Sequence, residues 1–429
     1  MRRKVKPFMT SLSFITVIGA GLFAAEPGTT GALRTSDPAA WSQWRGPNRD
    51  GIAREKGLLR AWPKEGPPLL WKTSGLGRGW SSPVFGDGRI YITGDVGDSL
   101  FIYGLDESGR TVWRTTNGRS WRGSYPGARA ACTFYKGNLY NLNAHGRLVC
   151  LDARNGAEKW SVNILERFGG RSITWGLSEC VLVERGYVVV TPGGSLALMA
   201  ALDAETGRTL WKTPPIAGDR ASHASPIVFS YSGKRLISNC SAHHGFGVDA
   251  DTGRLLWTVP LRNAFGVNVA TPVYSSGCVY YVTPYAELGR CWRLVPKEGA
   301  FDPQLKWVIP LDTVTGCSIL TGGTLYAARY KQRKWWFAVD WKTGKIAAEL
   351  RSLTTGSAVY ADGRLYCFDE KGTVALVTPL AEGFQVISSF KLPGRRIRDA
   401  WAHPVVYRGR LYVRYHDTLS CYDVQKGSK

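Results

Sequence analysis

Short apolar runs, rather than long amphipathic stretches, make up most of this chain. The runs are separated by turns that contain Gly, as in residues 82–91, Ser-Pro-Val-Phe-Gly-Asp-Gly-Arg-Ile-Tyr. Apolar runs of this length, bounded by turn residues, are typical of β-strands. No segment keeps the 3.6-residue apolar spacing of a helix for long, so the pattern predicts an all-β fold.

A longer pattern repeats along the chain. Four segments run from an apolar stretch through Asp106, Asp152, Asp203 or Asp249 to a Gly, and then to a Trp. The Asp can accept hydrogen bonds from the turn, and the Gly can take a positive φ. The aspartates recur every 46 to 51 residues, a period typical of propellers and solenoids. Two more short strands precede each Asp, which gives four antiparallel strands per unit, as in a propeller blade.

Four further units complete a count of eight. They are less regular than the first four. The fifth keeps Trp307 at the Trp position, the sixth has Ala348 there, and the seventh has lost both Asp and Trp. These units span residues 269–310, 316–350, 356–392 and 400–427.

The eighth unit stops before its fourth strand, and a matching strand stands at the other end of the chain. Residues 70–73, Leu-Trp-Lys-Thr, are identical to the fourth strand at 210–213. We therefore predict an eight-bladed β-propeller with four-stranded antiparallel blades, closed by the N-terminal strand joining the last blade. Closure removes unpaired sheet edges.

The N-terminus has the layout of a secretory signal. Four cations precede an uncharged stretch that ends at Ala25, before Glu26. We predict a signal peptide over 1–25, an extension over 26–67 and a single propeller domain over 68–427. An uncleaved membrane anchor is the alternative for the first segment. The expected location is the periplasm or cell envelope.

The positions of the cysteines and the net charge narrow the range of expected cofactors and partners. The nine Cys are scattered, with no CxxC or CxxCH, so we expect buried free thiols and no covalently attached haem. The net charge of +22 favours anionic partners. Nucleic acid is not expected, because export argues against it and no recognition helix, basic arm or RNA-binding motif is present.

Two motifs resemble those of a known superfamily. The Asp-x-x-Thr-Gly-x-x-x-Trp turns at 203–211 and 249–257 resemble the tryptophan-docking motif of PQQ-like propellers. The segment 41–51, Trp-Ser-Gln-Trp-Arg-Gly-Pro-Asn-Arg-Asp-Gly, is similar to the opening of exported PQQ-like proteins common in planctomycete-type bacteria. The resemblance covers about residues 69–423. It implies structural roles for Trp71, Trp113, Trp160, Trp211, Trp257 and Trp307.

The superfamily holds enzymes and scaffolds, so the fold leaves the function open. Quinoprotein dehydrogenases bind PQQ and Ca²⁺, whereas BamB-type proteins are non-enzymatic scaffolds. We predict a BamB-like binding or scaffold protein, monomeric, with envelope proteins or anionic ligands such as polysaccharide as partners. Membrane contact is expected only if the signal is uncleaved.

A PQQ- and Ca²⁺-dependent oxidoreductase of alcohols or sugars is the first alternative. A polysaccharide-binding or lyase-like propeller is the second. The chain lacks a match to the dehydrogenases' Glu, Asn and Asp motifs, lacks their adjacent-cysteine disulfide, and is shorter than those enzymes usually are. Catalytic residues are therefore not assigned.

Basic and aromatic side chains concentrate in the loops expected to rim the central funnel. Together they would suit a flat anionic molecule such as PQQ, because Arg binds carboxylates bidentately and Trp can stack on a ring system. The alternative is a solvated rim on which the charged side chains stay apart and form no common site. The six His are too dispersed to predict a metal site. The candidate cofactor-binding residues are Arg78, Trp80, Arg122, Arg129, Trp175, His223, Arg398, Trp401 and His403.

Overall fold

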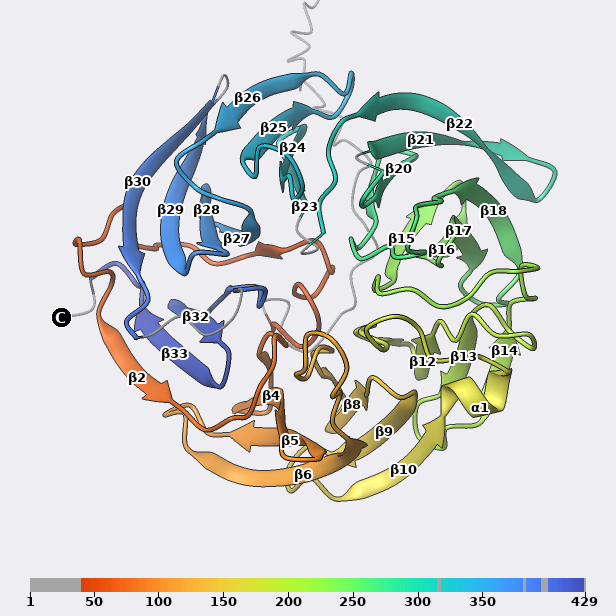
Figure 1. Ribbon diagram of the computed structural model, residues 1–429, viewed down its shortest axis with the longest axis horizontal. Coiled ribbons are helices and arrows are strands. Elements are labelled where there is room, and N and C mark those ends of the chain that lie inside the picture. The colour runs from red at the N-terminus through yellow and green to blue at the C-terminus, as the bar shows by residue number, and fades with distance from the viewer. Residues whose placement is uncertain (1–39, 287, 315–317, 381–382, 395–399, 428–429) are drawn as a thin grey trace, which may run out of the picture.

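Eight β-sheets form a ring around a central axis in the computed structural model (Figure 1). The structure describes residues 40–427, except 287, 315–317, 381–382 and 395–399. Each sheet has four antiparallel strands, and one of them gains a short parallel fifth strand. The predicted all-β, eight-bladed propeller is confirmed. The predicted domain boundaries remain predictions, and the segment 1–25 lies outside the described residues.

The strands run outward from the axis in chain order within blades 1 to 6, and blades 7 and 8 each add one strand from the N-terminal segment. Blades 1 and 2 contain β3 (Val84–Gly86), β4 (Arg89–Val96), β5 (Ser99–Leu105), β6 (Thr111–Arg119), β7 (Thr133–Tyr135), β8 (Asn138–Leu142), β9 (Arg147–Asp152) and β10 (Glu158–Asn163). Blades 3 and 4 contain β11 (Leu182–Glu184), β12 (Tyr187–Val190), β13 (Ala200–Asp203), β14 (Thr209–Lys212), β15 (Ile227–Tyr231), β16 (Lys234–Cys240), β17 (His244–Asp249) and β18 (Leu255–Pro260).

The second half of the ring repeats this arrangement. Blades 5 and 6 contain β19 (Val273–Ser275), β20 (Cys278–Thr283), β21 (Leu288–Lys297), β22 (Ala300–Ile309), β23 (Ser318–Thr321), β24 (Thr324–Ala328), β25 (Trp336–Asp340) and β26 (Ile346–Leu350). Blades 7 and 8 contain β27 (Gly356–Ala361), β28 (Arg364–Asp369), β29 (Thr373–Leu380), β30 (Gly383–Lys391), β31 (Val405–Tyr407), β32 (Arg410–Tyr415), β33 (Thr418–Asp423) and β2 (Leu69–Thr73).

The ring closes as predicted. Strand β2 pairs antiparallel with β33, with Leu69 opposite Tyr422 and Trp71 opposite Cys421. A strand from before the first blade is therefore paired with the last strand of the chain, and both ends of the propeller are held in one sheet (Figure 1). A sheet edge that would otherwise be open to other chains is paired.

The repeated Trp residues lock neighbouring blades together. The indole Nε1 of Trp113 donates to the Ala153 carbonyl of the next blade at 3.2 Å, and Trp71 donates to the Glu107 carbonyl at 2.9 Å. The Gly of the turn lies directly against the ring: a Cβ on Gly156 would stand 2.5 Å from Trp113. The motif therefore needs Gly both for its positive φ and for the space that the indole occupies.

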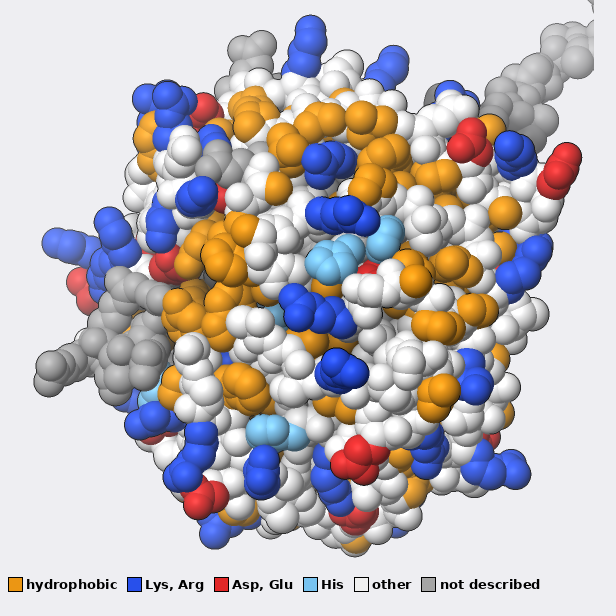
Figure 2. Space-filling model, turned by 45° about the vertical axis from the view of Figure 1, so that its right-hand side comes forward, with side chains coloured by type: hydrophobic (Ala, Val, Ile, Leu, Met, Phe, Trp, Pro, Cys, Tyr) orange, Lys and Arg blue, Asp and Glu red, His pale blue; other side chains and the backbone are white. Residues whose placement is uncertain are grey.

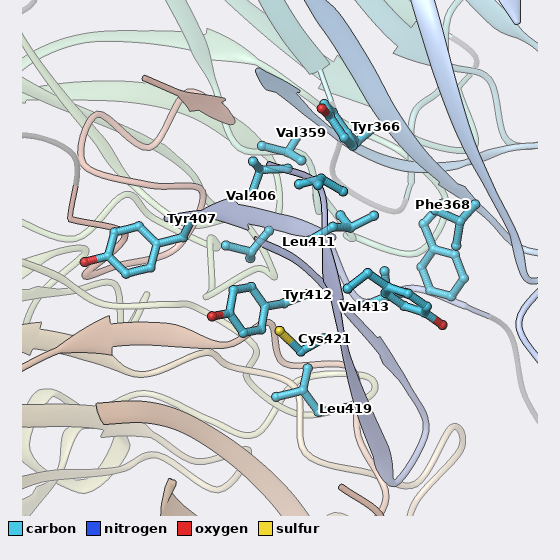
Figure 3. Close-up of a cluster of buried hydrophobic side chains, with 14 of the residues drawn as sticks. Val359, Tyr366, Phe368, Val406, Tyr407, Leu411, Tyr412, Val413, Leu419 and Cys421 are labelled. Carbon is cyan, nitrogen blue, oxygen red and sulfur yellow. The ribbon is translucent and has the colours of Figure 1, made fainter. Parts of the chain in front are cut away.

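The core lies between the blades. Figure 3 shows one part of it, where Val359 and Tyr366 of blade 7 lie near Leu411, Tyr412 and other side chains of blade 8. The eight cysteines that the structure describes are all buried and free, which agrees with the expectation from their apolar surroundings.

One short helix departs from the all-strand pattern. Helix α1 (Ile164–Phe168) follows β10, with Asn163 as N-cap and Gly169 in the left-handed conformation at its end. Five residues are too few for helical periodicity to stand out in a sequence. Among the described residues, no helix has the length and apolar character needed to cross a membrane.

Candidate functional site

A pocket of about 200 Å³ lies at the centre of the ring, built mainly from the connections that lead into the blades, with loops inside blades 5 and 6 and the segment before the first blade completing it. Its walls are largely aromatic. The aromatic lining residues are Trp44, Trp80, Trp175, Trp401, Tyr125, Tyr285 and Tyr330. The remaining lining residues are Arg129, Ser178, Cys180, His223, Ser225, Val269, Thr271, Val314 and His403. Concave, mainly apolar sites with a few placed polar groups are typical of ligand-binding pockets.

The aromatic rings form a continuous wall on one side of the pocket. Trp80 lies 4.9 Å from Trp401 between ring centroids, and Tyr125 lies 5.3 Å from Trp401 and 6.0 Å from Trp175. Trp175 in turn lies 6.0 Å from His223. These residues come from five separate connections between blades, so only the closed ring brings them together.

Three of the pocket aromatics have backbone conformations that bulky residues rarely adopt. Tyr125, Trp175 and Tyr285 have φ values of 56°, 68° and 65°. The left-handed region costs a non-glycine residue roughly 1–2 kcal/mol. Such strain persists where the surrounding structure imposes it and clusters at functional sites. Twelve other described non-glycine residues also have a positive φ, many of them in hairpin turns, so the strain adds to the evidence from the shape of the pocket and does not mark a site by itself.

Arg129 supplies positive charge to the pocket. Its guanidinium donates to the carbonyls of Gly127 at 2.6 Å and Tyr125 at 2.7 Å, and it lies over the rings of Trp80 and Trp121. Burial lowers the pKa of Arg129 to about 10, which still leaves it charged at neutral pH. Its hydrogen-bond partners are neutral carbonyls, and the nearby Asp95 carboxylate opposes the lowering of its pKa without bonding to it. The guanidinium is therefore a cation that an anionic ligand could meet.

His223 adds a buried polar group to the pocket wall. Its Nδ1 lies 3.3 Å from the Ser178 hydroxyl. Burial lowers the pKa of His223 to about 4, Arg129 lowers it further, and an interaction with the Thr174 backbone opposes the shift. The ring is therefore neutral at neutral pH.

Six of the nine candidate residues line the pocket: Trp80, Arg129, Trp175, His223, Trp401 and His403. Arg78 and Arg122 do not. Arg78 is exposed, and its backbone bonds to Asp95 and Ala128 hold the loop before β3. Arg122 pairs with Asp98 on the exposed rim, where its side chain is 72% accessible. Arg398 lies outside the described residues.

Sequence reasoning missed several lining residues. Tyr285 and Tyr330 lie in the loops between the second and third strands of blades 5 and 6, where the repeat departs from that of the first four blades. Trp44 belongs to the segment before the first blade, and no repeat signal places that segment at the axis. The mixture of aromatic and basic residues in the loops was the available signal. It predicted the aromatic wall of the pocket but not the lining residues contributed by Trp44, Tyr285 and Tyr330.

The fold family raises the question whether PQQ and Ca²⁺ fit this pocket. The aromatic wall suits a flat ring. However, no Asp or Glu side chain is part of the lining that the described residues form, and they contain no group of three His, Cys, Asp or Glu able to hold a metal. Calcium needs several oxygen ligands, and the three carboxylates of PQQ would meet a single Arg there. The described lining fits a flat ring and does not fit the Ca²⁺-dependent cofactor set.

Positive charge elsewhere is dispersed. On the face shown in Figure 2, Lys and Arg side chains are spread among apolar and neutral surface rather than gathered in one patch. The net charge of +22 thus adds a general attraction for anions and does not by itself define a second site.

The ring of four-stranded blades, with Trp-bearing turns between them, defines a PQQ-like β-propeller. More specifically, the chain belongs to the family described as outer membrane protein assembly factor BamB, whose model matches residues 98–350. Recognition of the superfamily from its sequence motifs is confirmed.

Curated relatives with sequence similarity are quinoprotein enzymes. The quinohemoprotein alcohol dehydrogenase ADH-IIG of Pseudomonas putida is 29% identical over 148 residues, which are 32% of this chain and 20% of that protein. The dehydrogenase subunit of the quinone alcohol dehydrogenase of Gluconacetobacter polyoxogenes is 26% identical over 141 residues, 30% of this chain and 19% of that protein. These matches span about a fifth of the length of the curated relatives.

Solved structures of both kinds share the fold. BamB from Moraxella catarrhalis superposes with a TM-score of 0.60 at 16% identity, covering 83% of this chain and 99% of that one. The quinohemoprotein alcohol dehydrogenase of Comamonas testosteroni gives 0.63 at 13% identity, covering 91% and 81%. At these identities the likeness shows the fold alone.

Proposed function

We propose that this chain is a binding protein of the cell envelope, which captures a ring-bearing anionic ligand in its central pocket. The observation that carries the proposal is the strained aromatic wall beside Arg129. Aromatic faces bind flat rings, and a partly desolvated guanidinium gives the anion a strong, directional partner. The family description, which concerns outer-membrane protein assembly, supports the envelope location and protein partners there.

The quinoprotein alternative has observations on both sides. The aromatic wall and the alcohol dehydrogenase relatives favour it. The described lining, however, offers neither calcium ligands nor a carboxylate base beside the aromatic wall. Asp95, whose pKa burial raises to about 6, is not part of that lining. We therefore place binding ahead of oxidation as the function of this pocket.

Titration of the purified protein with anilinonaphthalene sulfonate, an aromatic anion, tests the proposal. We expect saturable binding that Trp175→Ala and Arg129→Gln each weaken about tenfold or more, since a stacking contact or a charged hydrogen bond is worth about 1.4 kcal/mol or more. Arg122→Gln is the matched control, because that guanidinium is paired on the rim. Equal binding by all four proteins would overturn the proposal.

A parallel titration with PQQ and Ca²⁺, followed by absorbance and by dye-coupled oxidation of ethanol or glucose, separates the two functions. The binding proposal predicts no turnover. Turnover that depends on Trp175 and Arg129 would establish the oxidoreductase instead.

A further inference from the structure

The N-terminal segment from Trp41 to Ala53, called the axial plug below, passes through the middle of the ring. Its first contacts are with blades 1 and 2. The Phe85 amide donates to the Trp41 carbonyl at 2.9 Å, and the Phe134 amide donates to the Ser42 carbonyl at 2.7 Å. Both amides belong to the innermost strands, β3 and β7.

Two buried arginines of the axial plug bind carbonyls of three more blades. Arg49 donates to Cys180 at 2.5 Å and to Val181 at 3.3 Å, just before β11, and to Pro226 at 2.6 Å, just before β15. Arg45 donates to the Ser318 carbonyl of β23 at 2.5 Å. These bonds reach blades 3, 4 and 6.

The axial plug also contacts the remaining three blades, which are blades 5, 7 and 8. Strand β1 (Ile52–Ala53) pairs in parallel with β27 of blade 7. The Trp44 indole donates to the Thr271 hydroxyl, which precedes blade 5, at 3.1 Å. The same indole lies 4.4 Å from the ring of His403, which precedes blade 8. One short segment thus contacts all eight blades at the axis.

These contacts are strong because they are buried. Arg49 is 2% exposed, and burial lowers its pKa to about 10. A buried guanidinium is tolerated where carbonyl oxygens satisfy its donors, and carbonyls at the start of the inner strands do so here. Removing the side chain would leave buried carbonyls of two blades without their partner, which costs more than the bond itself contributes.

The axial plug also lies between two cavities. Trp44 lines the central pocket, whereas Arg45, Asn48, Arg49 and Asp50 line a second cavity of about 570 Å³. The second cavity is completed by hairpin turns of blades 4, 5 and 6, and the two cavities share no lining residue. The axial plug therefore separates the central pocket from this second cavity.

We propose that the axial plug closes the propeller axis and is the floor of the central pocket, with Trp44 setting the depth of that pocket. This inference rests on the proposed ligand-binding function. It assigns Trp44 as a residue that determines which ring-bearing anions fit. The pocket then opens at one end only, and the extension before the first blade is an integral part of the binding site.

The size preference of the pocket tests the role of Trp44. Two probes that share the anionic group, naphthalene sulfonate and the larger anilinonaphthalene sulfonate, are titrated into the wild type, Trp44→Phe and Trp44→Ala. We expect Trp44→Ala to shift the affinity ratio towards the larger probe by about tenfold, with Trp44→Phe between the two. An unchanged ratio in folded Trp44→Ala would overturn the assignment.

Hydrogen exchange tests the closure without any ligand. Arg49→Met is expected to speed exchange of the inner strands β11 and β15, on both blades whose carbonyls Arg49 binds. Arg54→Met, an exposed arginine just beyond β1, is the control and should leave those strands unchanged. Faster exchange confined to the axial plug would overturn the closure. If the wild type binds neither probe, the proposed function fails, while the exchange result still decides the closure.

Discussion

Replacement of Trp257 by Ala is expected to lower the free energy of unfolding by about 4 kcal/mol, in the range found for Trp deletions in cores. Trp257 is 4% exposed and lies at the joint between blades 4 and 5. Its ring stands edge-on to Phe301 at 5.7 Å, and its Nε1 donates to the Tyr281 hydroxyl at 3.2 Å. The ring lies directly against the backbone of Gly247, since a Cβ there would stand 1.9 Å from it.

Thr258→Ala provides the control for this measurement. Thr258 is the next residue of the same strand but is exposed, so its replacement should change stability by less than about 0.5 kcal/mol. Both variants are compared with the wild type by urea unfolding, followed by circular dichroism so that the lost Trp does not alter the signal. Equal midpoints for the two variants would show that the Trp does not lock the blades together.

The same joint explains why the blade count could be predicted from sequence. The Asp, Gly and Trp of each unit have local roles: the turn, the positive φ and the contact with the next blade. Residues with local roles recur at a fixed spacing in the sequence, which makes each blade recognisable. Blade 5 keeps Trp307, which donates to the Trp341 carbonyl of blade 6 at 3.0 Å, so even an irregular unit was recognisable.

The pocket could be predicted only in part, for a physical reason. Loop residues were assigned by their position between strands, which indicates the face of the ring but not the direction of a side chain. Arg122 points to the rim because Asp98 binds it there, whereas Arg129 folds back onto carbonyls of its own loop. Trp44 could not be placed, because its position depends on contacts with blades that lie hundreds of residues later.

Glu179→Gln is expected to make the protein more stable at pH 8 by about 3 kcal/mol, with the difference vanishing near pH 4. Burial raises the pKa of Glu179 to about 7 in the folded protein, opposed by its bonds from Thr191 and by Arg49. Between the ordinary carboxyl pKa and 7, the unfolded chain loses the proton while the folded chain keeps it. The wild type therefore loses about 1.4 kcal/mol per pH unit across this window from this group alone.

Urea unfolding of the wild type and Glu179→Gln at half-unit steps from pH 4 to pH 8 measures this difference directly. Other buried groups, such as Asp95 and His223, titrate in both proteins and cancel in the comparison. The amide retains an oxygen for the Thr191 N–H, now at 2.8 Å, and its NH₂ can donate to the Thr191 hydroxyl. The bond that Asn239 Nδ2 donates to the carboxylate at 3.4 Å is lost, but Asn239 still donates to the Thr191 hydroxyl at 2.9 Å. Glu205→Gln, on the exposed turn of the same blade, controls for the carboxyl-to-amide change.

A Glu179→Gln difference that stays constant with pH would show that the carboxyl is ionised in the folded protein. Glu179 would then be held as an anion beside Arg49, and the axial plug would be anchored by charge as well as by carbonyl bonds.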